Sequence, residues 1–298
     1  MFHRSYFRLF SFLILIILTA CSFNPSKATE TPFSSVATDT LGIPTPTQPA
    51  MAIQVNGEGV WLVEYQASLQ QFQQAQTSLG TQYTDAEARQ MVIDDLVNQV
   101  LLEQGAIAAG YQPDSVEVQA RMDSLASQIG SQEDFQTWLQ NNFYTTEIFK
   151  QSLARNIAAD WQKQQIRSQV PTAADHVHAR QILVYSSDKA DQIYSNLQAG
   201  AIFQTLAFQY DPLTGGDLGW FPRGYLTQKS VEDAAFSLQP GQYSAVIQTE
   251  FGYHIIEVIE RDPAYPLSAD ALQVLQKVAV ADWIVQQKAN STIEVLIP

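Results

Sequence analysis

The chain has 298 residues, of which 46% are hydrophobic, and it carries a formal net charge of −14 at pH 7. This length and composition exclude wholesale disorder and are sufficient for two modest hydrophobic cores. The acidic balance excludes free nucleic acid as a partner, because phosphate binding needs a basic surface. We therefore expect two globular units with an acidic, soluble surface.

The N-terminus has the layout of an export signal. Arg4 and Arg8 precede an apolar run, residues 9–18, that is too short to span a bilayer comfortably. Cys21 is the only cysteine, so no intrachain disulfide can form. The Leu-Thr-Ala-Cys segment ending at Cys21 resembles the lipobox of bacterial lipoproteins, which implies lipidation of Cys21 and anchoring to the extracytoplasmic side of a membrane. An uncleaved anchor, or an ordinary signal with an incidental cysteine, is the alternative.

A spacer and a helical unit are predicted next. Residues 21–50 are rich in Ser, Thr and Pro and show no apolar period, which is typical of a disordered linker. Residues 53–55 predict a short strand, and Asn56-Gly57 a tight turn. From there to Pro171, apolar residues recur at three- and four-residue steps, which predicts an all-helical unit over 51–172. The first helical pattern has Tyr65 on its apolar face, and start signals for the later elements fall at Thr84 (a capping box with Glu87), Asp114, Ser131 (a short turn) and Thr145.

A different period marks a second unit over residues 173–262. From Val177 the apolar period is two, which predicts a strand. Helices that we expect to be capped by Ser187 and Ser230 follow, together with further strands around residues 246–247 and 253–259. The predicted order is β-α-α-β-α-β-β, typical of one sheet flanked by helices.

The C-terminal region, residues 263–298, predicts a helix from Ser268 and an alternating strand over 292–297. A lone terminal strand needs a partner, and the strand at 53–55 is the candidate. We therefore predict an α+β protein in which the second unit is inserted into the helical one. The full predicted division is a signal over 1–20, a linker over 21–50, a helical domain over 51–172, an α+β domain over 173–262 and a C-terminal helix and strand over 263–298.

Residues 175–262 contain several ordered motifs. They are a Val-x-Ala-x-x-Ile-Leu-Val strand, Gly-Gly-Asp-Leu-Gly-Trp-Phe from Gly215, Phe236-x-Leu238 before Pro240-Gly241, and Phe-Gly-Tyr-His-Ile-Ile around His254. In this combination the segment resembles the parvulin peptidyl-prolyl isomerases. The whole layout is similar to the exported foldases of the PrsA and SurA type.

The resemblance implies a set of site residues. His254 matches one of the family's paired active-site histidines, and Thr249 matches the threonine before it. Gln181 stands where the family has the second histidine, and Asp211 lies near a loop position that holds Cys or Asp. The implied apolar grip on the proline ring comes from Leu218, Leu226, Val231 and Phe251.

This chemistry needs neither a cofactor nor a metal, since a pocket that binds a twisted amide is sufficient. His176 and His178 form a His-x-His pair with no evident third ligand, so we interpret them as solvated residues rather than a metal site. No Gly-Lys-Ser/Thr follows the glycines at 215, 216 and 219, so we predict close backbone packing rather than a phosphate loop.

The sequence therefore predicts a lipid-anchored peptidyl-prolyl isomerase and chaperone in the cell envelope. Its partners would be unfolded or partly folded exported polypeptides with X-Pro bonds. The alternatives are a holdase whose parvulin-like unit only binds proline-containing segments, and a structural envelope lipoprotein.

Overall fold

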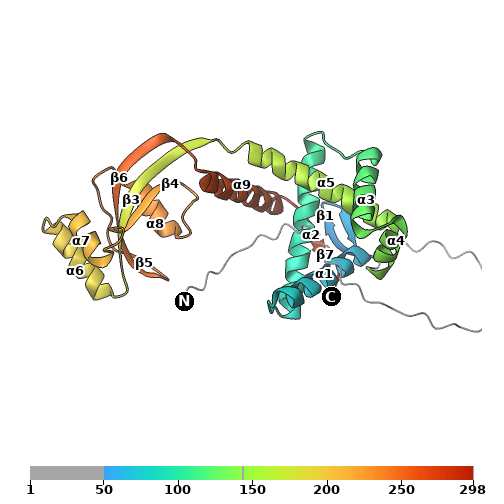
Figure 1. Cartoon of the computed structure of the whole chain (residues 1–298), viewed down its shortest axis with the longest axis horizontal. Coiled ribbons are helices and arrows are strands. Elements are labelled where there is room, and N and C mark those ends of the chain that lie inside the picture. The colour runs from blue at the N-terminus through green and yellow to red at the C-terminus, as the bar shows by residue number, and fades with distance from the viewer. Residues whose placement is uncertain (1–49, 143, 298) are drawn as a thin grey trace, which may run out of the picture.

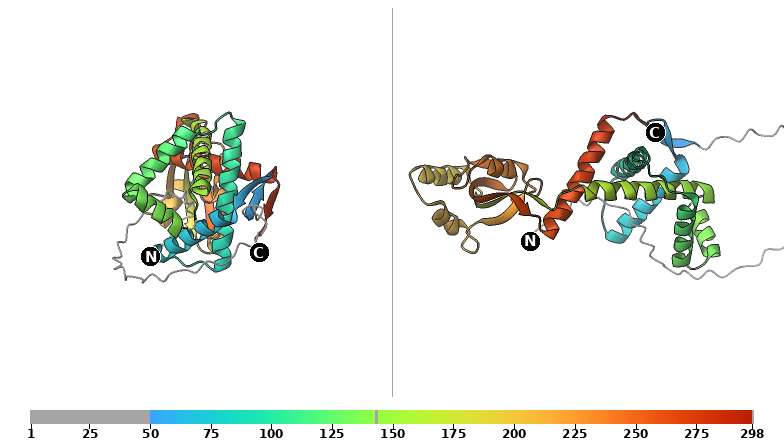
Figure 2. Two further views of the ribbon diagram at one scale, coloured as in Figure 1. Left: turned by 90° about the vertical axis from the view of Figure 1, so that its right-hand side faces the viewer. Right: turned by 90° about the horizontal axis from the view of Figure 1, so that it is seen from above.

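The structure, a computed structural model, describes residues 50–142 and 144–297. Within these residues the chain forms two lobes, and helix α9 (Ala269–Ala289) lies between them (Figure 1). A second view, from above, shows the same separation of the lobes (Figure 2). The predicted export signal and Cys21 fall outside the described residues. Within the described part of the chain, no helix has the length and apolar character needed to cross a membrane.

The helical lobe is formed by the N-terminal half of the described chain and by the C-terminal strand. Its elements in chain order are β1 (Met51–Val55), β2 (Glu58–Trp61), α1 (Leu62–Leu79), α2 (Asp85–Ala108), α3 (Ser115–Ile129), α4 (Gln132–Asn141), α5 (Thr146–Ser168) and β7 (Ile293–Val295). One hydrophobic core lies between β1, α1 and α2, and a second lies between α3, α4 and α5. Helix α9 contributes Trp283, which packs where Gly105 leaves room on α2.

Side-chain caps begin most of these helices where the sequence predicts them. Thr84 and Glu87 form the reciprocal capping box of α2. Asp114, Thr145 and Ser268 accept hydrogen bonds from the first turns of α3, α5 and α9. The predicted short turn at Ser131 is wrong, because the Ser131 hydroxyl caps a full helix, α4, whose Phe135 and Leu139 are buried four residues apart.

A buried ion pair joins α1 to α5. Arg155 Nη1 lies 2.6 Å from Glu64 Oε1, and both side chains are almost fully buried. The Ser152 hydroxyl donates to the same Glu64 oxygen over 2.7 Å, and Arg155 Nε lies 3.1 Å from Glu103 on α2. Burial, opposed by Arg155 and reinforced by Glu58, raises the pKa of Glu103 to about 7. More carboxyl groups than cations therefore meet in this interior, which favours the protonated form of Glu103.

The α+β lobe contains a four-stranded antiparallel sheet in the order β4-β3-β6-β5. Its elements are β3 (Ala173–Val184), α6 (Ser187–Gln198), α7 (Phe203–Tyr210), β4 (Asp217–Pro222), α8 (Lys229–Ser237), β5 (Ile247–Thr249) and β6 (Gly252–Pro266). The predicted element order is confirmed. Figure 1 shows β3 and β6 curving out of this lobe toward α5 and α9.

Several predicted boundaries in this lobe are wrong, and one of them is the end of the last strand, β6, which runs to Pro266 instead of ending near residue 259. Strand β3 begins at Ala173 rather than Val177, because β6 runs on to Pro266 and pairs with it there. Helix α6 begins at Ser187 rather than after it, because the Ser186 carbonyl accepts the Ala190 N–H. Ser230 lies inside α8, because the carbonyl of Gln228 already accepts the N–H groups of residues 231 and 232.

The predicted partner of the terminal strand is confirmed. β7 pairs antiparallel with β1, with Val295 opposite Ile53 and Ile293 opposite Val55. Asn56, at φ 53°, starts the turn into β2, and its side chain accepts the Thr292 N–H over 2.9 Å. The α+β lobe is thus an insertion between two segments of one helical lobe. Strand β2, which completes the order β2-β1-β7, was not predicted.

Candidate active site

The two faces of the four-stranded sheet are covered by different helices. Helix α8 packs on one face, where its Val231, Ala235 and Phe236 meet strand residues in one buried cluster. Helices α6 and α7 cover the other face. Side chains alternate between the faces along a strand, so Gln181 follows Ala179 on the α8 face and His254 precedes Ile256 there. The side chains of Gln181 and His254 therefore lie on the same face of the sheet.

His254 is buried at this face and is held at both ring nitrogens. Only 4% of the residue is exposed. Its Nδ1 lies 2.9 Å from Oε1 of Gln181 on the neighbouring strand, and its Nε2 lies 2.8 Å from the Thr249 hydroxyl on β5. Leu183 is the direct partner of His254 in the ladder, so Gln181 is its diagonal neighbour. Three of the four predicted catalytic residues thus meet in one hydrogen-bond chain.

The hydrogen bonds assign the protons in this chain. A carboxamide oxygen only accepts, so the Gln181 contact places a proton on Nδ1 of His254. Nε2 of the neutral ring is then an acceptor, and the Thr249 hydroxyl donates to it. The same hydroxyl oxygen accepts the Phe251 N–H over 3.1 Å. Burial lowers the pKa of His254 below the ordinary value, so the ring is neutral at pH 7.

A close backbone approach holds Gln181 in register. The Gln181 N–H donates to the Gly216 carbonyl over 2.8 Å, which joins the loop before β4 to β3. Gly216 has φ 69°, and a Cβ at this position would overlap the carbonyl oxygen of Gln181. The predicted close backbone packing of the glycine segment is therefore confirmed at this residue.

Asp211 does not touch His254 and instead organises its own loop. Its carboxylate accepts the N–H groups of Leu213, Thr214 and Gly216 over 3.1 to 3.2 Å and also the Thr214 hydroxyl. These hydrogen bonds, led by the one from the Thr214 hydroxyl, lower its pKa. Asp211 thus connects to the hydrogen-bonded chain only through Gly216, whose carbonyl holds the Gln181 N–H.

The predicted pocket residues separate into two groups. Leu218 and Leu226 are half-buried and pack against the cluster that contains the buried Val231. Phe251 lies apart from that cluster, in the β5–β6 turn, and is 54% exposed. Ile247 packs on the same cluster and stands opposite His254 in the β5–β6 ladder. The sequence reasoning missed Ile247, although its two-residue spacing from Thr249 places both on one face.

The prediction that His176 and His178 are both solvated is wrong for His176. This residue is 2% exposed, its Nδ1 lies 2.8 Å from the Ala174 carbonyl and its ring packs on Tyr265. The cause is the longer β3–β6 pairing, which covers residue 176. His178 is partly exposed and lies 2.9 Å from Asp217. Across residues 50–142 and 144–297, no three His, Cys, Asp or Glu side chains are placed to hold a metal ion.

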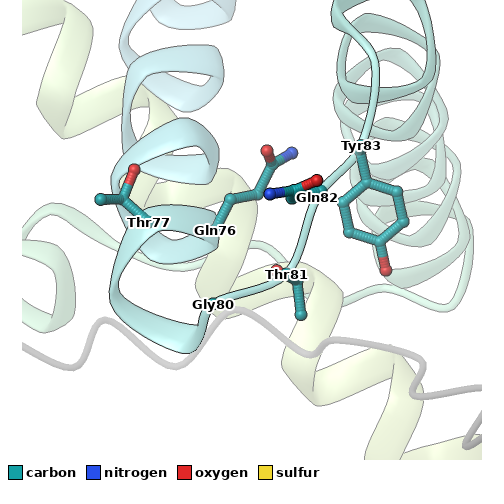
Figure 3. A pocket seen from close by; sticks show the side chains of 6 residues that line it. All are labelled: Gln76, Thr77, Gly80, Thr81, Gln82 and Tyr83. Carbon is teal, nitrogen blue, oxygen red and sulfur yellow. The ribbon is translucent and has the colours of Figure 1, made fainter.

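A depression in the helical lobe lies far along the chain from these residues. It is lined by Gln76, Thr77 and Gly80 at the end of α1 and by Thr81, Gln82 and Tyr83 before α2 (Figure 3). Its lining is mostly polar and contains none of the predicted site residues. The candidate active site is therefore the α8 face of the four-stranded sheet.

Known proteins share both parts of this architecture. Residues 184–260 match the family described as PPIC-type PPIASE domain. Residues 3–163, more than half of the chain, match the SurA-like N-terminal domain. The foldase protein PrsA of Geobacillus sp. (strain WCH70) is 30% identical over 197 residues, which cover 62% of this chain and 69% of that protein. The chain belongs to the PrsA foldase family.

A second PrsA protein matches the chain to a similar extent. The PrsA of Caldanaerobacter subterraneus subsp. tengcongensis is 30% identical over 223 residues, 68% of this chain and 71% of its own length. A crystal structure of Bacillus anthracis PrsA matches 66% of this chain and 96% of that one, with 26% identity and a TM-score of 0.41. As a PrsA-family protein with a PPIC-type domain, the chain is a peptidyl-prolyl isomerase and foldase, and its partners are substrate polypeptides.

Proposed function

We propose that the α8 face of the four-stranded sheet is the site of prolyl isomerisation, with His254, Gln181 and Thr249 as its polar groups. The observation that carries this proposal is the buried His254, held at both nitrogens beside an apolar cluster. Leu218 and Leu226, both half-buried, pack against that cluster, and Val231 is one of its buried members. This combination suits a proline ring next to an amide whose polarity changes during the reaction.

The reaction is rotation about a partial double bond. An X-Pro bond has a barrier of about 18–20 kcal/mol, because the amide loses conjugation as it twists. No covalent step is needed if the pocket binds the twisted amide better than either planar form. Apolar contacts hold the ring while the carbonyl end turns, and fixed dipoles favour the altered charge distribution of the twisted state. The neutral His254, oriented by Gln181 and Thr249, is such a dipole.

Gln181 in place of the family's second histidine changes what the site can do with protons. Gln181 accepts from Nδ1 of His254 without titrating itself, so it holds one tautomer of the ring at every pH at which the ring is neutral. The proposed catalysis therefore relies on orientation rather than on a shared proton. The same substitution favours the second candidate function, a unit that binds proline-containing segments without turnover.

Exchange between the cis and trans signals of an X-Pro peptide, measured by NMR with the chain from residue 22 onward, tests the proposal. We expect His254→Ala to lower the exchange rate on the order of a hundredfold, the effect of removing one preorganised polar group. Gln181→Ala should have a smaller effect, because Thr249 still contacts the ring. His178→Ala is the matched control, since this histidine contacts Asp217 instead. Equal exchange rates in the wild type and the three variants would refute the proposed site. A peptide that binds the wild type without cis-trans exchange would instead support the second candidate function, binding without turnover.

We further propose that the chain acts in the cell envelope, anchored to the membrane through a lipid on Cys21. The support is the sequence alone: a charged start, a short apolar run and one cysteine. Mass spectrometry of the protein from membranes should find acyl groups on residue 21 as the first residue. Cys21→Ser should release the protein into the soluble fraction. A chain that is bound to the membrane but carries no acyl group would contradict the lipid anchor. The alternative, an uncleaved N-terminal anchor, would then explain the membrane binding.

A further inference from the structure

Glu232 is a buried acidic residue with an unusual set of partners. It lies on α8 directly after Val231 and is 6% exposed. Its Oε1 accepts the Gly224 N–H over 2.8 Å, and its Oε2 accepts the N–H groups of Tyr225 and Leu226, each over 3.0 Å. Among the described residues, no lysine or arginine forms an ion pair with it. Three consecutive backbone amides therefore compensate the charge.

These three amides belong to the loop that carries Leu226 from β4 to α8. A backbone N–H inside a folded protein needs an acceptor, and the ladder hydrogen bonds of β4 end before this loop. One carboxylate supplies acceptors for all three donors, because each of its oxygens accepts more than one hydrogen bond. Gly224, at φ 82°, allows the turn that points the three N–H groups the same way.

The effect of this arrangement is to set the position of one pocket wall. The Leu226 N–H donates to Glu232, the residue that follows Val231, so this hydrogen bond fixes the backbone of Leu226 relative to α8. Both pack on the same cluster as Leu218. Neither Leu218, which is on β4, nor Val231, which is on α8, depends on the loop for its position. Leu226 does.

We propose that Glu232 is a positioning residue for prolyl isomerisation, whose carboxylate holds the loop of residues 224–226 so that Leu226 closes the proline pocket. This inference rests on the proposed function, because it assumes that Leu218, Leu226 and Val231 grip the ring. Glu232 does not touch the substrate in this scheme. It acts on substrate affinity through the loop.

The test compares Glu232→Gln with Asp233→Asn in the chain from residue 22 onward. Glutamine keeps the size but presents an NH₂ group to at least one of the backbone N–H donors. Asp233, the next carboxylate on α8, is the matched control: it pairs with the solvent-exposed Lys229 and, over 3.9 Å, with the exposed Arg223, and it accepts none of the three loop N–H groups. The dissociation constant of an X-Pro peptide and its cis-trans exchange rate at saturation are both measured by NMR.

We expect Glu232→Gln to raise Kd about tenfold, the usual effect of losing one hydrogen bond to a charged group, while the rate at saturation changes far less. Asp233→Asn should leave both values unchanged. A purely structural role would lower the folded fraction without changing Kd of the folded protein. The Tyr225 and Leu226 amides should also lose protection from hydrogen exchange in the variant, while those of β3 and β6 keep it.

Leu226→Ala separates this inference from the function on which it rests. If Leu226→Ala weakens peptide binding but Glu232→Gln does not, Glu232 is no positioning residue and the pocket stands. If Leu226→Ala has no effect, the pocket assignment itself fails, and this inference fails with it. Should Glu232→Gln not fold, Glu232→Asp keeps the charge but shortens the reach, and an unchanged Kd in that variant would likewise overturn the proposal.

Discussion

Replacement of Gly216 by alanine tests whether the backbone at Gln181 controls the site. Gly216 has φ 69° and Gly219 has φ 68°, so an alanine at either position meets the same left-handed backbone penalty of about 1–2 kcal/mol. The surroundings differ. A Cβ on Gly216 would overlap the Gln181 carbonyl oxygen, whereas nothing lies within 4 Å of a Cβ on Gly219. The Gly219→Ala variant is therefore a control in which only the backbone conformation is penalised.

Relief of the overlap requires the loop to move away from β3. This movement breaks the hydrogen bond from the Gln181 N–H to the Gly216 carbonyl and leaves its buried groups without partners, at about 1–3 kcal/mol. We expect Gly216→Ala to lose about 2–5 kcal/mol of unfolding free energy when both terms are included. Gly219→Ala should lose only the backbone part.

Urea unfolding and peptide exchange by NMR measure these two effects. At a temperature where both variants are folded, Gly216→Ala should also lose exchange activity, because Gln181 shifts away from Nδ1 of His254. Gly219→Ala should keep its activity. Equal destabilisation of the two variants, together with full activity of Gly216→Ala, would refute the reasoning.

Three further predictions concern charge and pH. Arg155→Met should lower the free energy of unfolding of the helical lobe by about 3–5 kcal/mol in urea, because it leaves the buried Glu64 carboxylate unpaired. Lys163→Met is the comparison, because its partner Asp160 is 72% exposed, and it should change this free energy by less than about 1 kcal/mol. Similar losses in both variants would contradict the buried pair. Because the pKa of His254 is lowered in the folded state, the folded protein binds fewer protons at this residue than the unfolded chain does. The contribution of His254 to stability should therefore be lost as the pH falls from about 6.5 through the folded pKa. NMR signals of the ring that titrate above pH 6.5 would disprove this. Glu103, whose pKa is raised to about 7, has the opposite sign: its contribution to stability is complete below pH 4.5 and is lost as the pH rises through 7. Hydrogen-exchange protection in α2 should therefore fall over this pH range in the wild type and not in Glu103→Gln. The same pH profile in both proteins would count against this role of Glu103.

Local signals in the sequence predicted much of this fold. Thr84 with Glu87, and Ser268 before the last helix, act within one turn of chain, so their hydrogen bonds can be read from spacing. The terminal strand was predictable too, because a strand with no local partner must pair elsewhere. The motif around His254 predicted, through its family resemblance, the histidine on which the proposed site is built.

Contacts between distant segments were not predictable in the same way. The burial of His176 depends on how far β3 and β6 stay paired, and the spacing of apolar residues in the sequence does not show where that pairing ends. The partners of Glu232 are backbone N–H groups six to eight residues away, and such groups are present whatever the side chains are, so no residue pattern signals these contacts. Asp211 likewise showed its role only when its loop was seen to fold back on its carboxylate.

The connection between the lobes is a paired ribbon rather than a single linker. β3 and β6 stay paired, across two register shifts, as far as Ala173 and Pro266, and the Leu267 N–H still donates to the Thr172 carbonyl over 2.8 Å. A tether made of two hydrogen-bonded strands resists twisting and stretching far better than one flexible chain. If the helical lobe holds a polypeptide, that polypeptide would meet the proposed isomerase face at an effective concentration set by this stiff spacing. Prolines within one range of distances along such a held polypeptide would then reach the proposed site, and those nearer or farther would not.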